Sequence, residues 1–212
     1  MKKVQIKLYL EFAFLYIIIP IALAVFLPSK RFAIPVLILA IMPTIFLLRI
    51  SKNSIIPKFL QDEKQLITVK TISIIFVRFI IIAIILYAIM YHVRPDALFS
   101  FPRRSPRHWL IIMIMYPLLS VVPQTLIYRI LFVRRYSDLF RTKTATLIIG
   151  ATVFSLAHAM FKNEVVLIMT FLGGILFLKN YQKSQSLWLN ILEHSLYGNL
   201  LFTLGYGHYF FR

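Results

Sequence analysis

Residues 109–136 read "WLIIMIMYPLLSVVPQTLIYRILFVRRY", and this stretch decides both the fold class and where a site should be sought. A helix that crosses a bilayer needs about 20 predominantly apolar residues, and this run is long enough to supply them. Yet Gln124, Thr125 and Arg129 lie inside it. Because an unpaired charge in hydrocarbon is costly, Arg129 is expected to have a partner or a function.

The composition of the whole chain agrees with a membrane protein. Of its 212 residues, 60% are hydrophobic, and the mean hydropathy is +0.82. Soluble domains have about 45–50% apolar residues, so this excess is too large for a soluble core. The chain has no cysteine, which excludes disulfide bonds and thiolate chemistry.

Apolar runs along the chain predict an all-α, polytopic transmembrane helical bundle of about seven spans. The predicted spans cover residues 8–27, 32–50, 69–91, 108–133, 145–161, 164–181 and 186–209. The first resembles a signal peptide, but its apolar run is long and contains Glu11, so we expect it to remain as the first helix. We expect one membrane domain, with N-terminal transmembrane helices in residues 1–107 and the core helices that carry the polar motifs in residues 108–212.

The net charge of +17 does not indicate nucleic-acid binding, because the basic residues lie in short loops between apolar runs. That distribution suits contact with anionic headgroups, so membrane lipids are expected partners and nucleic acid is not. With seven spans, 14 of the 24 Lys and Arg residues fall on the side of the membrane that holds the N-terminus, 8 fall on the opposite side, and two lie within spans. The positive-inside rule therefore predicts a cytoplasmic N-terminus.

The polar residues of the fourth span share helix faces. Thr125 and Arg129 are four residues apart, as are Gln124 and Tyr128, so each pair lies on one side of the helix. One interpretation is a hydrogen-bonded strut between helices. The other is a hydrated cavity lined by these side chains.

Two later spans add histidines. The segment "ATVFSLAHAMFKN" (151–163) carries His158, and "NILEHSLYGNLLFTLGYGHYF" (190–210) carries His194 and Asn199. A single histidine in a span is commonly a hydrogen-bonded core residue, but three spans with polar faces can converge on one pocket. Two imidazoles there would hold a divalent metal such as zinc or position a water, and an amide would stabilise an oxyanion.

These segments resemble the CPBP family, which comprises CAAX prenyl proteases and bacteriocin-processing enzymes and is also called Abi. The family's first element, carried on one span, is Glu-Glu-x-x-x-Arg. Here "QTLIYR" takes that place. Arg129 matches the arginine, while Gln124 and Thr125 stand where the family has two glutamates.

The second family element, Phe-x-x-x-His, is complete in "FSLAH", with Phe154 and His158. The third is a histidine followed four residues later by Asn or Asp. His194 fits it, but Asn199 comes one position late and Gly198 takes the expected place. On a straight helix this turns Asn199 by about 140° from His194.

The resemblance covers roughly residues 108–209 and implies an intramembrane endopeptidase, metal-dependent or glutamate-dependent, in a bacterial plasma membrane. Its substrates would be membrane-anchored proteins or peptides, through CAAX-type or leader processing. Carried over to this chain, the family's roles assign His158 and His194 to the metal or the water. Asn199 would stabilise the oxyanion, and Arg129 would belong to the polar scaffold.

The absence of the two glutamates leaves the function open. Gln124 is neutral and Thr125 is a poor base, and loss of a general base typically lowers a rate by about 10²–10⁴-fold. The alternative is a catalytically inactive pseudoprotease that binds membrane peptides or partner proteins. A third candidate, a small transporter or channel, fits less well because no internal repeat is found and carboxylates within the spans are scarce.

Other carboxylates in the spans are not expected to supply the base. Glu193 precedes His194 and so points about 100° away from it around the helix. Glu164 begins a span and is expected at the interface. Glu11 and Arg78 are expected to pair with each other or with interfacial groups.

Overall fold

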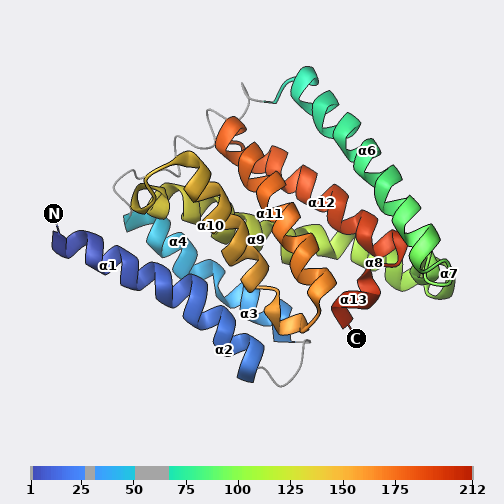
Figure 1. Ribbon diagram of the computed structural model, residues 1–212, viewed down its shortest axis with the longest axis horizontal. Helices are drawn as coiled ribbons and strands as arrows, with labels where there is room; N and C mark the ends of the chain where they lie inside the picture. Colours follow the sequence, from blue (N-terminus) through green and yellow to red (C-terminus); the bar gives the residue numbers. More distant parts are fainter. Residues whose placement is uncertain (1, 27–31, 51–66, 212) are drawn as a thin grey trace.

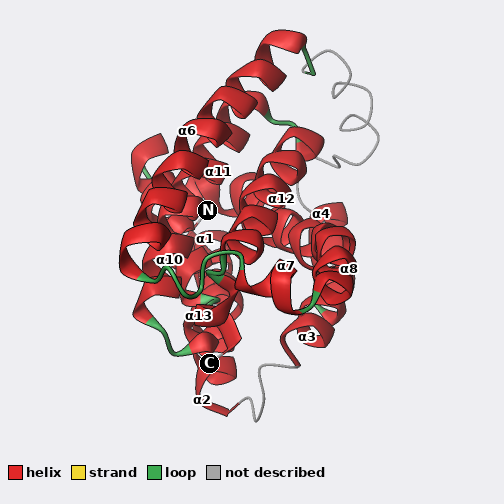
Figure 2. Ribbon diagram, turned by 90° about the vertical axis from the view of Figure 1, so that its right-hand side faces the viewer, coloured by secondary structure: helices red, strands yellow, loops and turns green. Residues whose placement is uncertain are grey.

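The computed structural model describes residues 2–26, 32–50 and 67–211, and within these ranges every regular element is a helix (Figure 2). The predicted all-α fold class is thereby confirmed. In chain order, with η marking π- or 3₁₀-helical segments, the elements are α1 (Lys2–Ala13), η1 (Phe14–Ile18), α2 (Ile19–Phe26), α3 (Ala33–Leu39), α4 (Ile41–Ile50), α6 (Val69–Val93), α7 (Ser100–Arg104), α8 (Pro106–Tyr116), η3 (Pro117–Val121), α9 (Val122–Thr125), η4 (Leu126–Tyr136), η5 (Ser137–Leu139), α10 (Lys143–Leu156), η6 (Ala159–Phe161), α11 (Glu164–Ser184), α12 (Leu187–Leu204) and α13 (Gly207–Phe211).

Six helices in the described part of the chain are long and apolar enough to cross a membrane, as expected for an integral membrane protein. They are Gln5–Phe26, Ala33–Ile50, Val69–Val93, Pro106–Leu139, Lys143–Phe161 and Glu164–Ser184, and they correspond to the first six predicted spans. The seventh predicted span, 186–209, is divided between α12 and α13 by a turn at Gly205. α12 has 18 residues but is not among the six, because polar residues such as Glu193 and His194 lower its hydropathy.

Side-chain caps set where several helices begin. A hydroxyl or amide oxygen at the N-cap accepts a hydrogen bond from a backbone N–H that has no partner within the helix. The residues that cap in this way are Thr68 for α6, Thr142 for α10, Asn163 for α11 and Ser186 for α12. α12 ends where Gly205 adopts a φ of 100°, a left-handed conformation that glycine reaches without strain.

The helix over residues 106–139 is continuous for 34 residues and longer than the predicted 108–133. Its winding widens to π-helical in η3 and again in η4. Pro117 begins the first of these segments, and Pro123 lies shortly before the second. Because proline lacks a backbone donor, it interrupts regular α-helical bonding. Such π-helical segments are rare and frequently mark functional sites.

The helices pack as one bundle (Figure 1). α10 and α11 lie side by side, α6 lies along one edge against α12, and the helix over residues 2–26 lies along the opposite edge. A cluster of buried rings from Phe12, Tyr16, Phe132 and Tyr136 joins this first helix to η4. The rings of Tyr16 and Phe132, for example, lie 5.8 Å apart, edge to face.

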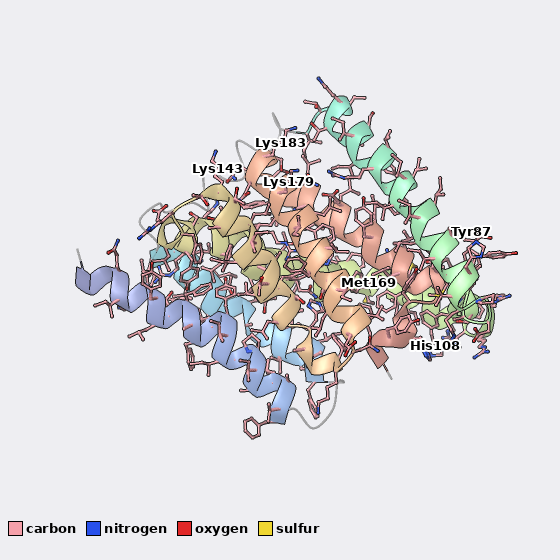
Figure 3. The ribbon with its side chains drawn as sticks, viewed as in Figure 1. Tyr87, His108, Lys143, Met169, Lys179 and Lys183 are labelled. Atoms are coloured by element: carbon pink, nitrogen blue, oxygen red, sulfur yellow. The ribbon has the colours of Figure 1, made fainter. Side chains whose placement is uncertain are left out.

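Basic side chains gather at one end of the bundle. Figure 3 shows Lys143, at the start of α10, close to Lys179 and Lys183, at the end of α11. His108 and Tyr87 lie well away from them in the same view. All three lysines belong to the set that the positive-inside rule places on the N-terminal side of the membrane.

Glu11 and Arg78 were expected to pair with each other or with interfacial groups, and the mutual pairing is wrong, because each has a different partner. The carboxylate of Glu11 accepts two hydrogen bonds from Arg135, at 2.5 and 2.7 Å. Arg78 instead forms an ion pair with Glu193. The first pair joins the N-terminal helix to η4, and the second joins α6 to α12. Glu11 and Arg78 therefore each have a neutralising partner on a neighbouring helix.

Candidate active site

A cavity of about 560 Å³ lies between the N-terminal helices and the long helix over residues 106–139. Its walls are mostly apolar and come from both N-terminal helices, the 106–139 helix, η6 and the C-terminal helices. Ligand pockets in proteins commonly measure about 300–1,000 Å³ and combine apolar walls with a few polar groups. The polar groups on this wall include Tyr116, Ser120, Gln124, Tyr128 and His158.

The two residues that replace the glutamates differ in what they face. Gln124 lines the cavity, and its Nε2 donates to Ser120 Oγ at 2.7 Å. Its Oε1 is buried without a hydrogen-bond partner in the described part of the chain. Thr125 is fully buried, does not line the cavity, and donates from its hydroxyl to the carbonyl of Val121 at 2.8 Å. Of these two residues, only Gln124 therefore has a side chain on the cavity wall.

Three of the predicted site residues meet around the ring of Phe154, the phenylalanine of "FSLAH". The guanidinium carbon of Arg129 lies 4.0 Å from the centre of this ring. The ring centroids of His158 and His194 lie 4.8 and 5.8 Å from it. Phe177 adds a second face, because His194 stacks on it at 4.5 Å and Arg129 lies 5.3 Å from its centre. The guanidinium and the two imidazoles thus each contact the ring of Phe154.

The two histidines are not equivalent. His158 follows the last turn of α10, and its Nδ1 lies 2.8 Å from the carbonyl oxygen of Phe154, which fixes the ring beside the cavity. His194 is only 4% exposed and does not line the cavity. Its Nε2 lies 3.4 Å from the hydroxyl of Tyr116, which does line the cavity. Tyr116 therefore stands between His194 and the cavity.

Sequence analysis did not single out Tyr116. One feature of the sequence could have identified it: Tyr116 is a polar side chain within an otherwise apolar run, directly before Pro117. A second signal was Gly198, since a Cβ at that position would meet the Tyr116 ring. The ring packs directly against the backbone of α12, which only a glycine allows.

Asn199 is separate from the histidines. Its Nδ2 donates to the backbone carbonyl of Met113 at 3.1 Å. This bond belongs to a row of contacts between α8 and α12, in which Trp109 also donates to Thr203 at 3.0 Å. The five-residue step from His194 turns the amide away from the imidazole, as helix geometry requires. In this arrangement Asn199 holds two helices together and does not line the cavity.

The described residues do not fit a resident zinc ion. Zinc sites usually have three or four protein ligands, and nowhere in residues 2–26, 32–50 and 67–211 are three His, Cys, Asp or Glu side chains grouped to hold a metal. His158 has its Nδ1 at the Phe154 carbonyl, so only its Nε2 is available as a ligand. The guanidinium of Arg129 beside the same ring opposes a cation.

A carboxylate base is also lacking on the cavity wall. None of the carboxylates in the described ranges lines the cavity. Glu193, next to His194 in sequence, is fully buried on another face of α12. It is ion-paired with Arg78, and Asn180 donates a hydrogen bond to it. Its oxygens are thus occupied outside the cavity.

The described part of the chain is thus a helical bundle with six helices long and apolar enough to cross a membrane, and it carries these polar residues inside. Residues 106–200 match the sequence model of the Rce1-like family, described as type II CAAX prenyl endopeptidase Rce1-like. The matched segment contains all the predicted site residues, and the match confirms the resemblance to the CPBP family. No curated protein and no solved structure matches the chain.

Proposed function

We propose that this protein binds the apolar part of a membrane-anchored protein or peptide in its cavity and does not cleave it. The observation that carries this proposal is the side chain of Gln124, which lines the cavity where a base would have to act. A CAAX-protease-like function, with membrane-associated proteins or peptides as substrates, follows from the family match. The absence of cleavage is our inference from the side chains.

The cavity favours a ligand that is mostly apolar with a polar portion at one end. Aliphatic and aromatic side chains make up most of its walls, and their burial against a ligand would supply the main part of the affinity. Gln124, whose Oε1 has no partner among the described residues, and the phenols of Tyr116 and Tyr128 are polar groups of this wall. Such groups can orient a peptide backbone by hydrogen bonds.

Hydrolysis would need a base that these residues do not provide. A neutral amide cannot take a proton from an attacking water, and the Thr125 hydroxyl is bonded to the Val121 carbonyl. Loss of a positioned general base typically costs about 10²–10⁴-fold in rate. His158 reaches the cavity and could orient a water, but orientation without a base leaves the reaction slow.

A working endopeptidase is the second candidate. The family match over residues 106–200 favours it, as does the presence of His158 on the cavity wall. In that case His158 would have to act as the base itself. The two candidates differ in one measurable property, which is whether bound peptide is cut.

The orientation in the membrane is also proposed. We propose that the protein lies in a bacterial plasma membrane with a cytoplasmic N-terminus. The distribution of Lys and Arg along the chain supports this orientation, as do the lysines gathered at one end of α10 and α11. Reporter fusions at either end of α6 would test it, since they should report opposite sides of the membrane.

The decisive experiment measures binding and cleavage together. The protein is reconstituted in liposomes with a lipid-anchored peptide whose apolar tail carries a photoreactive group. We expect cross-links to cavity residues and no peptide fragments from the native protein. The Gln124→Glu variant places a carboxylate on the cavity wall without changing the size of the side chain. Fragments that appear with this variant and vanish when His158→Ala is added would show that the missing base prevents cleavage.

The matched control is Gln5→Glu, the same change at an exposed glutamine of α1. It should leave both binding and cleavage as in the native protein. Fragments produced by the native protein and abolished by His158→Ala would establish the endopeptidase instead. A native protein that gives neither cross-links nor fragments would contradict both candidates.

A further inference from the structure

Arg129 is a buried cation whose donors have no acceptor among the residues that the structure describes. The residue is 1% exposed, and its Nε, Nη1 and Nη2 all lack a hydrogen-bond partner in the described part of the chain. Its guanidinium lies over the rings of Phe154 and Phe177. Ring faces attract the positive charge, but they do not accept the five N–H bonds, which lie in the guanidinium plane.

His194 adds a second buried ring nitrogen without a partner beside it. The imidazole stacks on Phe177, contacts Phe154 and lies within electrostatic range of Arg129. Its Nδ1 is buried without a partner among the described residues. The contact between the Tyr116 hydroxyl and Nε2 allows either atom to donate, so Nδ1 carries the ring proton only when the hydroxyl is the donor. Arg129 thus presents unpaired N–H groups, and His194 an unpaired ring nitrogen, around the same two rings.

The missing acceptor corresponds to one position in the sequence. Residue 125 is four residues before Arg129, which is the spacing at which a carboxylate and an arginine pair on one helix. Thr125 occupies that position, and its hydroxyl donates to the Val121 carbonyl. A buried charge left without its partner costs several kcal/mol in free energy of folding, so an acceptor from outside the chain would be bound favourably.

We propose that the guanidinium of Arg129 forms a buried binding site for a carboxylate anion, with Nδ1 of His194 as a second donor in the tautomer in which the Tyr116 hydroxyl donates to Nε2. A carboxylate is planar and accepts two parallel hydrogen bonds from a guanidinium, which makes it the best match to these donors. The anion takes the role that a glutamate at position 125 would have had within the chain.

The anion enters from the cavity. Tyr116 and Tyr128 line the cavity, and both also contact the ring cluster: Tyr116 through His194, and Tyr128 through Phe154 at 5.5 Å between ring centroids. Arg129 and His194 do not line the cavity themselves. A rotation of one of these tyrosines therefore opens the path to the buried donors.

The test is a titration of the detergent-purified protein with formate, followed by thermal unfolding. Ionic strength is held constant with a sulfonate buffer whose anion is too bulky for the site. We expect a saturable rise of the native melting temperature of about 2–4 °C, as for a ligand that stabilises a chain of this size by one site. A native response that is absent, or linear without saturation, overturns the proposal.

Three variants locate the effect. Thr125→Glu supplies the carboxylate within the chain, so its response to formate should be lost and its melting temperature without formate should rise. Arg129→Met should also lose the response. Arg107→Met, at an exposed arginine, should keep it. A saturable response that persists in Thr125→Glu or in a folded Arg129→Met contradicts the site, and the native titration decides the question if either variant fails to fold.

Two sources of the carboxylate are then distinguished. A short apolar peptide with a free C-terminus is compared with the same peptide carrying a C-terminal amide. A melting-temperature shift by the free acid at far lower concentration than formate identifies the terminus of a bound peptide as the source. Equal effects of both peptides, with a saturable response to formate, identify a small free anion. The formate result does not depend on peptide binding, so this site can fail while the proposed function stands, and the reverse.

Discussion

Glu193 and His194 are neighbours on α12, yet they belong to two clusters with opposite electrostatic character. On one face, Glu193 is ion-paired with Arg78, and Asn180 both accepts from Arg78 at 3.1 Å and donates to Glu193. On another, His194 shares the rings of Phe154 and Phe177 with Arg129, whose donors are unpaired in the described chain. One cluster is neutral, and we call it closed because both of its charges are paired, although the Nε of Arg78 has no partner among the described residues. The other is cationic and incomplete.

The two clusters have different roles: the first holds helices of the bundle together, and the second has side chains that can act on a ligand. The closed cluster joins α6, α11 and α12 and contains the single carboxylate of α12. That acid stabilises helix packing and cannot also serve the cavity. The incomplete cluster lies behind the cavity wall and keeps donors without an acceptor. Buried polar groups that are left unsatisfied are expected where a ligand completes them.

The largest effect is expected from Glu193→Gln. This change leaves Arg78 beside a neutral amide, and removal of one partner of a buried pair typically costs about 3–5 kcal/mol. Because the Arg78 side chain is 28% exposed, we expect the lower end of that range, about 3 kcal/mol, in the free energy of unfolding. Denaturant unfolding in detergent micelles measures it.

A double-mutant cycle with Arg78→Met is the control for that change. If the two residues act as a pair, the double variant loses less stability than the two single variants added together. Additive losses would mean that the ion pair contributes no stability of its own. The comparison between a closed and an incomplete cluster would then fail.

A smaller loss is expected from Gly198→Ala, on the side of α12 that faces Tyr116. The added Cβ would meet the Tyr116 ring, so the ring must move away from His194. Overpacking of this kind typically costs about 1–3 kcal/mol. Thermal unfolding measures the loss, and Tyr116→Leu in the same protein should relieve most of it. A Gly198→Ala variant as stable as the native protein would show that Tyr116 moves freely.

The cavity itself is tested by Ala40→Phe. Ala40 lines the cavity between α3 and α4, so a phenyl group there would occupy space meant for the ligand. We expect peptide affinity to fall about tenfold, equivalent to about 1.4 kcal/mol. The neighbouring Leu39 is 72% exposed, and Leu39→Phe is the matched control that should bind normally. Equal affinities for both variants would place the ligand elsewhere.

The smallest effect is expected from Asp96→Asn, in an ion pair outside the spans. Arg94 donates twice to Asp96 at 3.1 Å, and this hydrogen bonding lowers the pKa of the Asp96 carboxyl. A lowered pKa adds stability above the ordinary pKa of aspartate, and that stability is lost as the pH falls through the pKa of the folded protein. Both side chains are solvated, so this added stability is too small to measure. The melting temperatures of the native protein and the variant should therefore coincide from pH 7 to pH 3.

Sequence predicted the spans well because hydropathy is a local property of each run. The exception is α12, where burial among protein helices allows Glu193 and His194 within one helix. A helix that faces lipid needs a more apolar composition than a helix packed among other protein helices. The sequence of one helix does not show which of these surroundings it will have.

The site was predictable in part. The spacing of polar residues along each predicted helix identified Arg129, His158 and His194 as candidates, and these three meet at Phe154. Contacts between helices were not predictable in the same way. The partner of Arg78 depends on how α6 crosses α12, more than a hundred residues later in the chain. The same holds for the contact of Tyr116 with His194, which depends on the packing of α8 against α12.

The wide winding of η4 has a consequence for the length of the chain. Gln124, just before η4, must face the cavity, while Arg135, near its end, must reach Glu11 on the N-terminal helix. Removing one residue between them would rotate everything beyond it by about 100°, and the two requirements could no longer be met together. Natural variation in this segment should therefore conserve the number of residues, since that number sets the register of both ends.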